Sequence, residues 1–170
     1  MRKAKDIIGL PVVTIDTGKQ VGTVKDMRIG SDWQLKAIVL ESKTWFTEGR
    51  TVSSEHIAAL GTDAVTVQSE EAVMQDDYVQ ARPLAGGSGK LFGLPVLKTN
   101  GERLGVIEDV YFGRNLEIPV VGFELSEGFV TDLQEGRKTL AIPEHAKLGE
   151  DAIVVPTDCI TEAESLRISE

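Results

Sequence analysis

One triplet, Asp16-Thr17-Gly18, has the residue order that aspartic proteases place around a catalytic carboxylate. Such an enzyme needs two carboxylates that share one proton. The similar triplet later in the chain, Thr99-Asn100-Gly101, has no carboxylate at the Asp position. A homodimer could still pair two copies of Asp16, so an aspartic-type hydrolase is one alternative. Turn chemistry selects Asp, Asn and Gly at such positions and explains both triplets.

Two Glu-His pairs, Glu55-His56 and Glu144-His145, are the next candidates for acid–base chemistry. A carboxylate can orient an imidazole, but a catalytic base also needs a positioned partner, and the sequence offers none beside either pair. We therefore expect both histidines to be structural or exposed. The single cysteine, Cys159, excludes an internal disulfide. The sequence predicts no catalytic residue, no metal site and no cofactor, and so no enzyme.

Asp26 and Asp109 each lie in the middle of an expected strand, where Asp is unfavourable. One interpretation is a pair of acids in a groove, or a cation site. The other is a carboxylate that accepts backbone N–H bonds at a bulge or turn. A single carboxylate binds metal ions weakly, which favours the structural interpretation.

All these paired residues belong to an internal duplication. Its matching segments are Ile8 to Val13 with Phe92 to Leu97, Val21 to Met27 with Leu104 to Val110, Ala37 to Glu41 with Val120 to Glu124, and Asp63 to Val67 with Asp151 to Val155. The order of the segments is kept, so the chain consists of two tandem copies of one unit.

The sequence pattern of each copy predicts short strands separated by turns. In the first copy these are Val12 to Ile15, Val21 to Ile29, Leu35 to Glu41, Thr51 to Ser53 and Ala64 to Val67, with one helical turn within Ser54 to Leu60. Gly22 and Gly105 lie early in the second strand of each copy, where a bulge would let the sheet curl. The fold class is therefore all-β: two small β-barrels in tandem with few short helical turns.

The expected domains are a first repeat at 1–75, a linker at 76–89 and a second repeat at 90–165. The end of the linker, Pro83 to Gly89, has the composition of a flexible segment. The part before it, around Ala72 to Val79, is expected to form a short helix packed against a barrel.

The charge balance excludes several classes of function. The chain of 170 residues has 18 Lys and Arg against 27 Asp and Glu, a net charge of -9. Neither half could neutralise several phosphates, so direct nucleic-acid binding is not expected. The longest apolar run, Ile7 to Val13, is interrupted by Gly9 and Pro11, which predicts no membrane insertion. A cytoplasmic location is expected.

The repeated pattern of Gly-Leu-Pro-Val, a glycine turn, Gly-x-Val-x-Asp and an apolar strand ending in Glu resembles the PRC-barrel family. That family includes the cytoplasmic domain of the photosynthetic reaction-centre H subunit and the C-terminal domain of a ribosome maturation factor. The positions that carry the resemblance are Gly9, Val12, Gly18, Gly22, Val24 and Asp26, and then Gly93, Val96, Gly101, Gly105, Ile107 and Asp109. The resemblance implies a non-enzymatic β-barrel adaptor or scaffold that binds other proteins.

Two surfaces are candidates for such binding. Trp33 and Trp45 flank an apolar strand of the first copy, where aromatic side chains serve either as binding hot spots or as plugs of the barrel mouth. The longer loop of the second copy contributes Phe129, Val130 and Leu133. The acidic charge would steer a protein partner with a basic surface, and a homo-oligomer is also compatible. The alternative function is an accessory in RNA processing or ribosome assembly that acts through a ribosomal protein.

Overall fold

The computed structural model describes residues 1–42, 49–75, 80–114, 118–127 and 138–158. The first part of the chain forms β1 (Arg2–Lys3), α1 (Ala4–Ile7), β2 (Pro11–Thr14), β3 (Gln20–Ile29), β4 (Leu35–Leu40), β5 (Arg50–Ser53), η1 (Ser54–His56), β6 (Ile57–Leu60), β7 (Val65–Val67), η2 (Glu70–Ala72) and β8 (Val73–Gln75). The second part forms β9 (Arg82–Pro83), β10 (Pro95–Lys98), β11 (Arg103–Phe112), β12 (Val120–Ser126), β13 (Lys138–Ala141), β14 (Lys147–Leu148) and β15 (Ile153–Val155).

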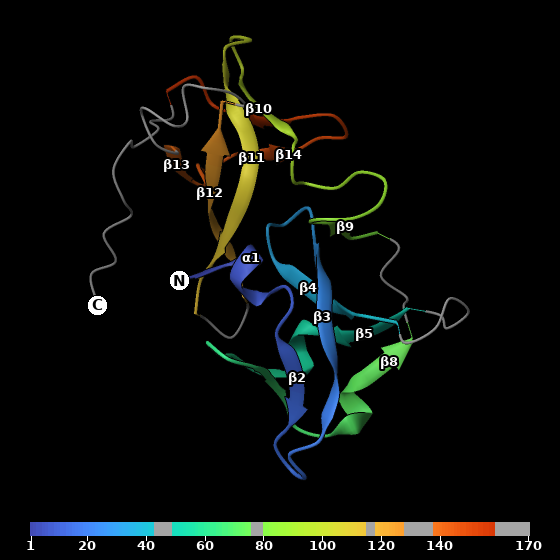
Figure 1. The fold of residues 1–170 in the computed structure, drawn as a ribbon. Helices are drawn as coiled ribbons and strands as arrows, with labels where there is room; N and C mark the ends of the chain where they lie inside the picture. The colour runs from blue at the N-terminus through green and yellow to red at the C-terminus, as the bar shows by residue number, and fades with distance from the viewer. Residues whose placement is uncertain (43–48, 76–79, 115–117, 128–137, 159–170) are drawn as a thin grey trace.

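The strands form two curled sheets, one for each repeat, which lie one above the other in Figure 1. The first sheet has the order β6-β7-β2-β3-β4-β5-β8, and the second has the order β13-β12-β11-β10-β15-β14. In both, a parallel pair (β2 with β7, β10 with β15) joins antiparallel hairpins, so the two topologies match. The all-β fold of two tandem repeats is therefore confirmed.

The curl of each sheet comes from bulges at the predicted glycines. The pairing of β2 with β3 shifts register beside Gly22, and the pairing of β10 with β11 shifts beside Gly105. Gly105 has φ +151°, and a Cβ there would lie 2.9 Å from the carbonyl oxygen of Ser126. A Cβ on Gly22 would lie 2.9 Å from Cδ1 of Leu40, a side chain that can move. The backbone of the second repeat is thus the less tolerant of the two at this bulge.

Two expectations about the middle of the chain need correction. The segment expected to be a short helix is a single 3-10 turn, η2, followed by strand β8, and its residues 76–79 lie outside the described part. The stretch from Pro83, expected to be flexible, begins within β9, which pairs with β3. Leu84, within this stretch, and Leu91, two residues after it, are fully buried, so the stretch is held in the core on both sides.

The two repeats share one continuous hydrophobic core. It contains large buried side chains of the first repeat, such as Met27 and Ile38, together with Phe112 and Phe123 of the second. Burying a large apolar side chain contributes about 1.5–3 kcal/mol. Since this apolar surface is common to both halves, the repeats are expected to unfold together.

Candidate functional site

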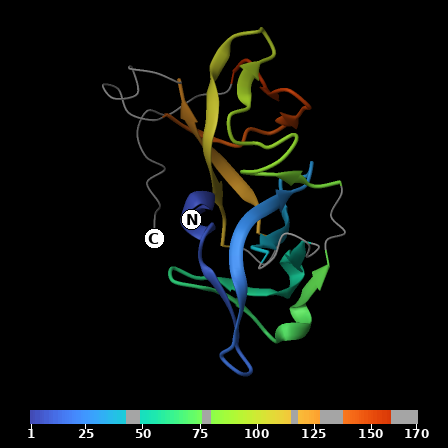
Figure 2. The same cartoon turned by 45° about the vertical axis from the view of Figure 1, so that its right-hand side comes forward.

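In the contact region between the repeats, called the junction below, the two repeats exchange the short strands β1 and β9, called the lead-in strands, each of which comes before the first hairpin of a repeat. β1 opens the first repeat but pairs with β11 of the second, with Arg2 opposite Phe112 and Lys3 opposite Tyr111. β9 precedes the second repeat but pairs with β3 of the first. Figures 1 and 2 both place α1, which follows β1, beside the strands of the second sheet. Each repeat thus completes the sheet of the other.

Asp26 fastens one of the exchanged segments. It follows a bulge in β3 and is 5% exposed. Its Oδ1 accepts the backbone N–H of Met27 at 2.7 Å and that of Ala85 at 3.0 Å, and its Oδ2 accepts that of Gly86 at 3.1 Å. The guanidinium of Arg28 lies 3.4 Å from Oδ2. This carboxylate therefore holds the segment that follows β9 against the first repeat.

Asp109 has the same position in the second repeat, also after a bulge. Its Oδ1 accepts the backbone N–H of Val110 at 2.8 Å and of Lys5, in α1, at 3.2 Å. Burial raises the pKa of Asp109, against the lowering effect of these hydrogen bonds, and the charge of Glu124 raises it further. The structural interpretation of both aspartates, carboxylates that bind backbone N–H groups at a bulge, is confirmed.

A backbone bridge on the symmetry axis of the repeats completes the junction. Gln34 bridges antiparallel to Pro119. On one side Leu35 N donates to Ile118 O at 3.0 Å, and on the other Val120 N donates to Trp33 O at 2.8 Å. The two bonds are related by exchange of the repeats. The junction therefore has the self-complementary pattern of a two-fold dimer interface within one chain.

Trp33 is part of this junction. Its Nε1 donates to the carbonyl of Ala146 at 3.1 Å, and its ring meets the ring of Phe123 edge-on at 5.3 Å between centroids. The indole therefore has its partners in the second repeat. The other candidate binding residues of the sequence, Trp45, Phe129, Val130 and Leu133, lie outside the described residues.

A charged cluster borders the exchanged strand β1. Glu124 is buried and accepts from Lys3 Nζ at 2.6 Å and from the hydroxyl of Tyr111 at 3.0 Å. The hydrogen bond from Lys3 to Glu124 raises the pKa of Lys3. Burial, and then the hydrogen bond to Glu124, raise the pKa of Tyr111. The cluster stabilises the proton-bound forms of both groups.

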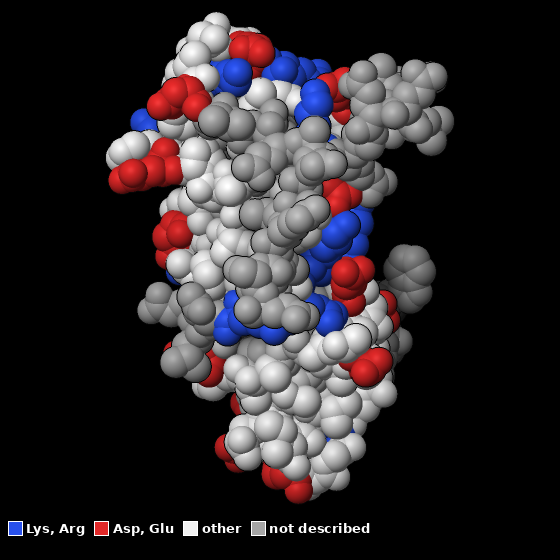
Figure 3. All heavy atoms as spheres, turned by 90° about the vertical axis from the view of Figure 1, so that its left-hand side faces the viewer, with Lys and Arg blue, Asp and Glu red and all other residues white. Residues whose placement is uncertain are grey.

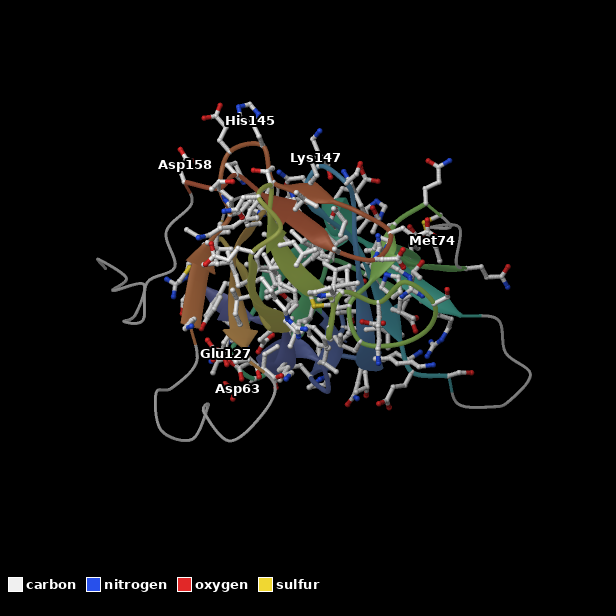
Figure 4. The ribbon with its side chains drawn as sticks, turned by 90° about the horizontal axis from the view of Figure 1, so that it is seen from above. Asp63, Met74, Glu127, His145, Lys147 and Asp158 are labelled. Carbon is white, nitrogen blue, oxygen red and sulfur yellow. The ribbon has the colours of Figure 1, made fainter. Side chains whose placement is uncertain are left out.

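The remaining chemical candidates are exposed. Asp16 lies in the turn between β2 and β3, where Gly18 has φ +66°, so the turn interpretation of the triplet is confirmed. His56 is exposed in η1. His145 is 80% exposed, 3.8 Å from Glu144, and Figure 4 shows it projecting outward. Within the described ranges no three metal-ligating side chains gather, and no helix there is long and apolar enough to cross a membrane.

The family is decided by a family model, the PRC-barrel domain, which matches the chain twice, at residues 1–74 and 87–158. The chain belongs to the PRC-barrel family. A search of curated proteins finds no match. PRC-barrel domains are generally non-catalytic, in line with the structural use of Asp26 and Asp109 in this tandem PRC-barrel protein.

Sequence reasoning missed the exchanged strands and the residues on them. Arg2 and Arg82 open β1 and β9 and are equivalent in the structure. Six positions separate Arg2 from Ile8, whereas ten separate Arg82 from the matching Phe92, so the repeat does not align there. The sequence signal for these strands is one basic residue ahead of the first matching segment of each copy, and this signal is too weak to predict a two-residue strand.

The sheet of the first repeat ends in edge strands. Among the described residues, β6 pairs only with β7, and β8 pairs only with β5. The most exposed large hydrophobic side chains described, Ile15 and Met74, both 54% exposed, also belong to this repeat. Met74 lies on β8, opposite Thr51 of β5, and Figure 4 shows it at the rim of the molecule. Edges of this kind can pair with another chain.

Proposed function

We propose that this PRC-barrel protein is a non-enzymatic adaptor whose first repeat binds a partner protein. The observation that carries the proposal is the edge strand β8, which exposes Met74 and, among the described residues, pairs with another strand on one side only. Soluble proteins usually protect such edges with charge or proline. An exposed apolar residue on an edge is instead typical of a surface that a partner covers.

The internal structure supports a scaffold rather than a catalyst. Asp26 and Asp109 each accept hydrogen bonds from backbone N–H groups at the junction. The exchanged strands and the shared core hold the two repeats as one body. A rigid body with two different surfaces suits a protein that fixes partners relative to each other. The net charge of -9 favours a partner with a basic surface, whose association would slow as salt rises.

Photo-crosslinking at Met74 tests the adaptor function. The full chain with a benzophenone amino acid at position 74 is irradiated in native cells, and the crosslinked protein is identified by mass spectrometry. The matched control has the same amino acid at Asn100, an exposed turn residue of the second repeat. We expect a discrete crosslink from position 74 alone, and loss of binding to the purified partner in Met74→Glu but not in Asn100→Glu.

The alternatives give other outcomes. A crosslink that forms in a native lysate but not in a lysate treated with RNase before irradiation would support the RNA-processing or ribosome-assembly function and contradict the simple adaptor. A crosslink to a second copy of this chain, with a doubled mass in solution, would make the β8 edge a homodimer interface. Equal crosslinking from positions 74 and 100 would refute a specific surface.

A further inference from the structure

The two repeats differ at one pair of equivalent arginines. Arg2 lies opposite Phe112, the last residue of β11, and Arg82 lies opposite Ile29, the last residue of β3. β3 and β11 are corresponding strands of ten residues each. Arg2 and Arg82 therefore occupy the same position on the two exchanged strands, and their surroundings can be compared directly.

The guanidinium of Arg82 finds its hydrogen-bond acceptors within the chain. It donates to the carbonyls of Gly89 at 2.6 Å, Gly149 at 2.7 Å and Glu150 at 3.3 Å. Gly149 and Glu150 begin the turn between β14 and β15. The arginine thus ties the lead-in strand to the edge hairpin of the second repeat.

Arg2 faces the corresponding turn without these bonds. That turn begins at Gly61 and Thr62, and Gly61 N donates to Ala64 O at 2.9 Å, as Gly149 N does to Ala152 O at 2.9 Å. Arg2 lines a groove of about 380 Å³ together with this turn. Its Nε is buried and has no hydrogen-bond partner among the described residues. A buried donor without an acceptor is unfavourable, so this position favours a ligand that brings one.

The groove has the charge and shape for an anionic strand. One wall is β6 (Ile57–Leu60), and the other contains Gly113, Arg114 and Ile118. The described lining residues include two arginines and no acidic side chain. Figure 3, which views the left-hand side of Figure 1, shows Lys and Arg side chains at mid-height of this face, with Asp and Glu beside them. Two guanidinium groups in a partly apolar groove favour a carboxylate.

We propose that this groove, the Arg2 groove, binds an extended acidic segment of a partner protein. The segment adds to the side of β6 on which no strand of the described part of the chain pairs, and one of its carboxylates lies between Arg2 and Arg114. An edge strand supplies backbone hydrogen bonds, and apolar walls such as Ile57 and Ile118 receive alternate side chains, so a peptide fits better than a small anion. The equivalent arginine of the second repeat, Arg82, already donates to carbonyls of the chain, so the proposal applies to the Arg2 groove and not to the corresponding place in the second repeat. The inference rests on the proposed function and names a second contact for it.

The test uses a fluorescein-labelled, end-blocked peptide of about six residues, alternating valine and threonine with one central glutamate. Binding to the full chain is measured by fluorescence anisotropy. We expect the glutamine version of the peptide to bind about tenfold more weakly, the loss typical of one charge-assisted hydrogen bond. Amide signals of β6 should shift when the glutamate peptide is added.

Variants locate the site. Arg2→Ala and Arg114→Ala should each weaken binding of the glutamate peptide about tenfold or more. Arg103→Ala, which removes the same charge from an exposed residue at the other end of β11, should leave binding unchanged. Arg114 is itself exposed, so its variant keeps the test valid if Arg2→Ala fails to fold.

The inference is overturned if the wild-type chain binds neither peptide, or binds both equally. It is also overturned if free glutarate or inorganic phosphate displaces the peptide as effectively as unlabelled peptide does, since the groove would then hold a small anion. A negative result here, with the crosslink from position 74 intact, removes the Arg2 groove and leaves the adaptor function standing.

Discussion

Asp26→Ala is expected to loosen the exchanged segment that follows β9. The substitution removes the acceptor for three backbone N–H groups, those of Met27, Ala85 and Gly86, at 2.7, 3.0 and 3.1 Å. A hydrogen bond to a charged group contributes about 1.5–3 kcal/mol, and less where water can replace it. Ala85 is half-buried and Gly86 is exposed, so water can partly satisfy them. We expect the free energy of unfolding to fall by about 2–4 kcal/mol.

Asp109→Ala is the matched comparison in the second repeat. Asp109 accepts only one bond from an exchanged segment, from Lys5 N at 3.2 Å. Burial raises the pKa of Asp109, so its charged form is itself unfavourable in the folded chain. Its removal is therefore expected to cost about 1 kcal/mol. Asp26→Asn keeps one acceptor oxygen and should fall between the two alanine variants.

The assay is urea unfolding at neutral pH, followed by tryptophan fluorescence, with amide hydrogen exchange as the local measurement. Exchange at Leu84 to Gly86 should speed up in Asp26→Ala and stay slow in Asp109→Ala. A loss of unfolding free energy in Asp109→Ala as large as in Asp26→Ala would contradict the fastening role of Asp26. Unchanged exchange at Leu84 to Gly86 in Asp26→Ala would contradict it as well.

Two further predictions concern pH and the bulges. Because the pKa values of Lys3 and Tyr111 are raised on folding, both groups hold their protons more tightly in the folded chain. Stability should therefore be highest below about pH 10 and decline above it, and urea midpoints at about pH 8 and pH 11 should show a smaller decline in Glu124→Gln. Gly105→Ala, at φ +151°, should cost about 2–3 kcal/mol of unfolding free energy, and Gly22→Ala about 1 kcal/mol. Thermal unfolding of the two variants checks the order, and a larger loss in Gly22→Ala would contradict the role of the strained backbone.

Much of the fold could be predicted because its signals are local. The turn at Asp16-Thr17-Gly18 follows from turn chemistry, and the strand predicted from Val21 to Ile29 differs from β3 by one residue. The bulges beside Gly22 and Gly105 follow from glycine within a strand pattern. The helix expected around Ala72 to Val79 was wrong from its start, because pairing with β5 makes Val73–Gln75 a strand.

The junction could not be predicted because its signals are not local. β1 and β9 have two residues each, too few for a period-two pattern. Since the two repeats have similar sequence patterns, the sequence does not show whether β1 or β9 pairs with its own repeat or with the other one. The role of Trp33 is ambiguous in the same way. Its position beside an apolar strand is compatible with a partner-binding surface or with a plug of the barrel mouth, and only the folded chain places its ring against Phe123.

The duplication, the all-β class, the hairpin turns and the bulge carboxylates can all be read from the sequence, because each depends on neighbouring residues. Long-range contacts alone establish which repeat receives β1 and β9 and that Asp26 and Asp109 fasten those segments. They also establish that Arg82 is hydrogen-bonded while Nε of its counterpart Arg2 has no partner in the described part of the chain. These features depend on which groups meet across the junction. The two repeats have the same local pattern of strands and turns, so the difference between their arginines appears only where the chain has packed against itself.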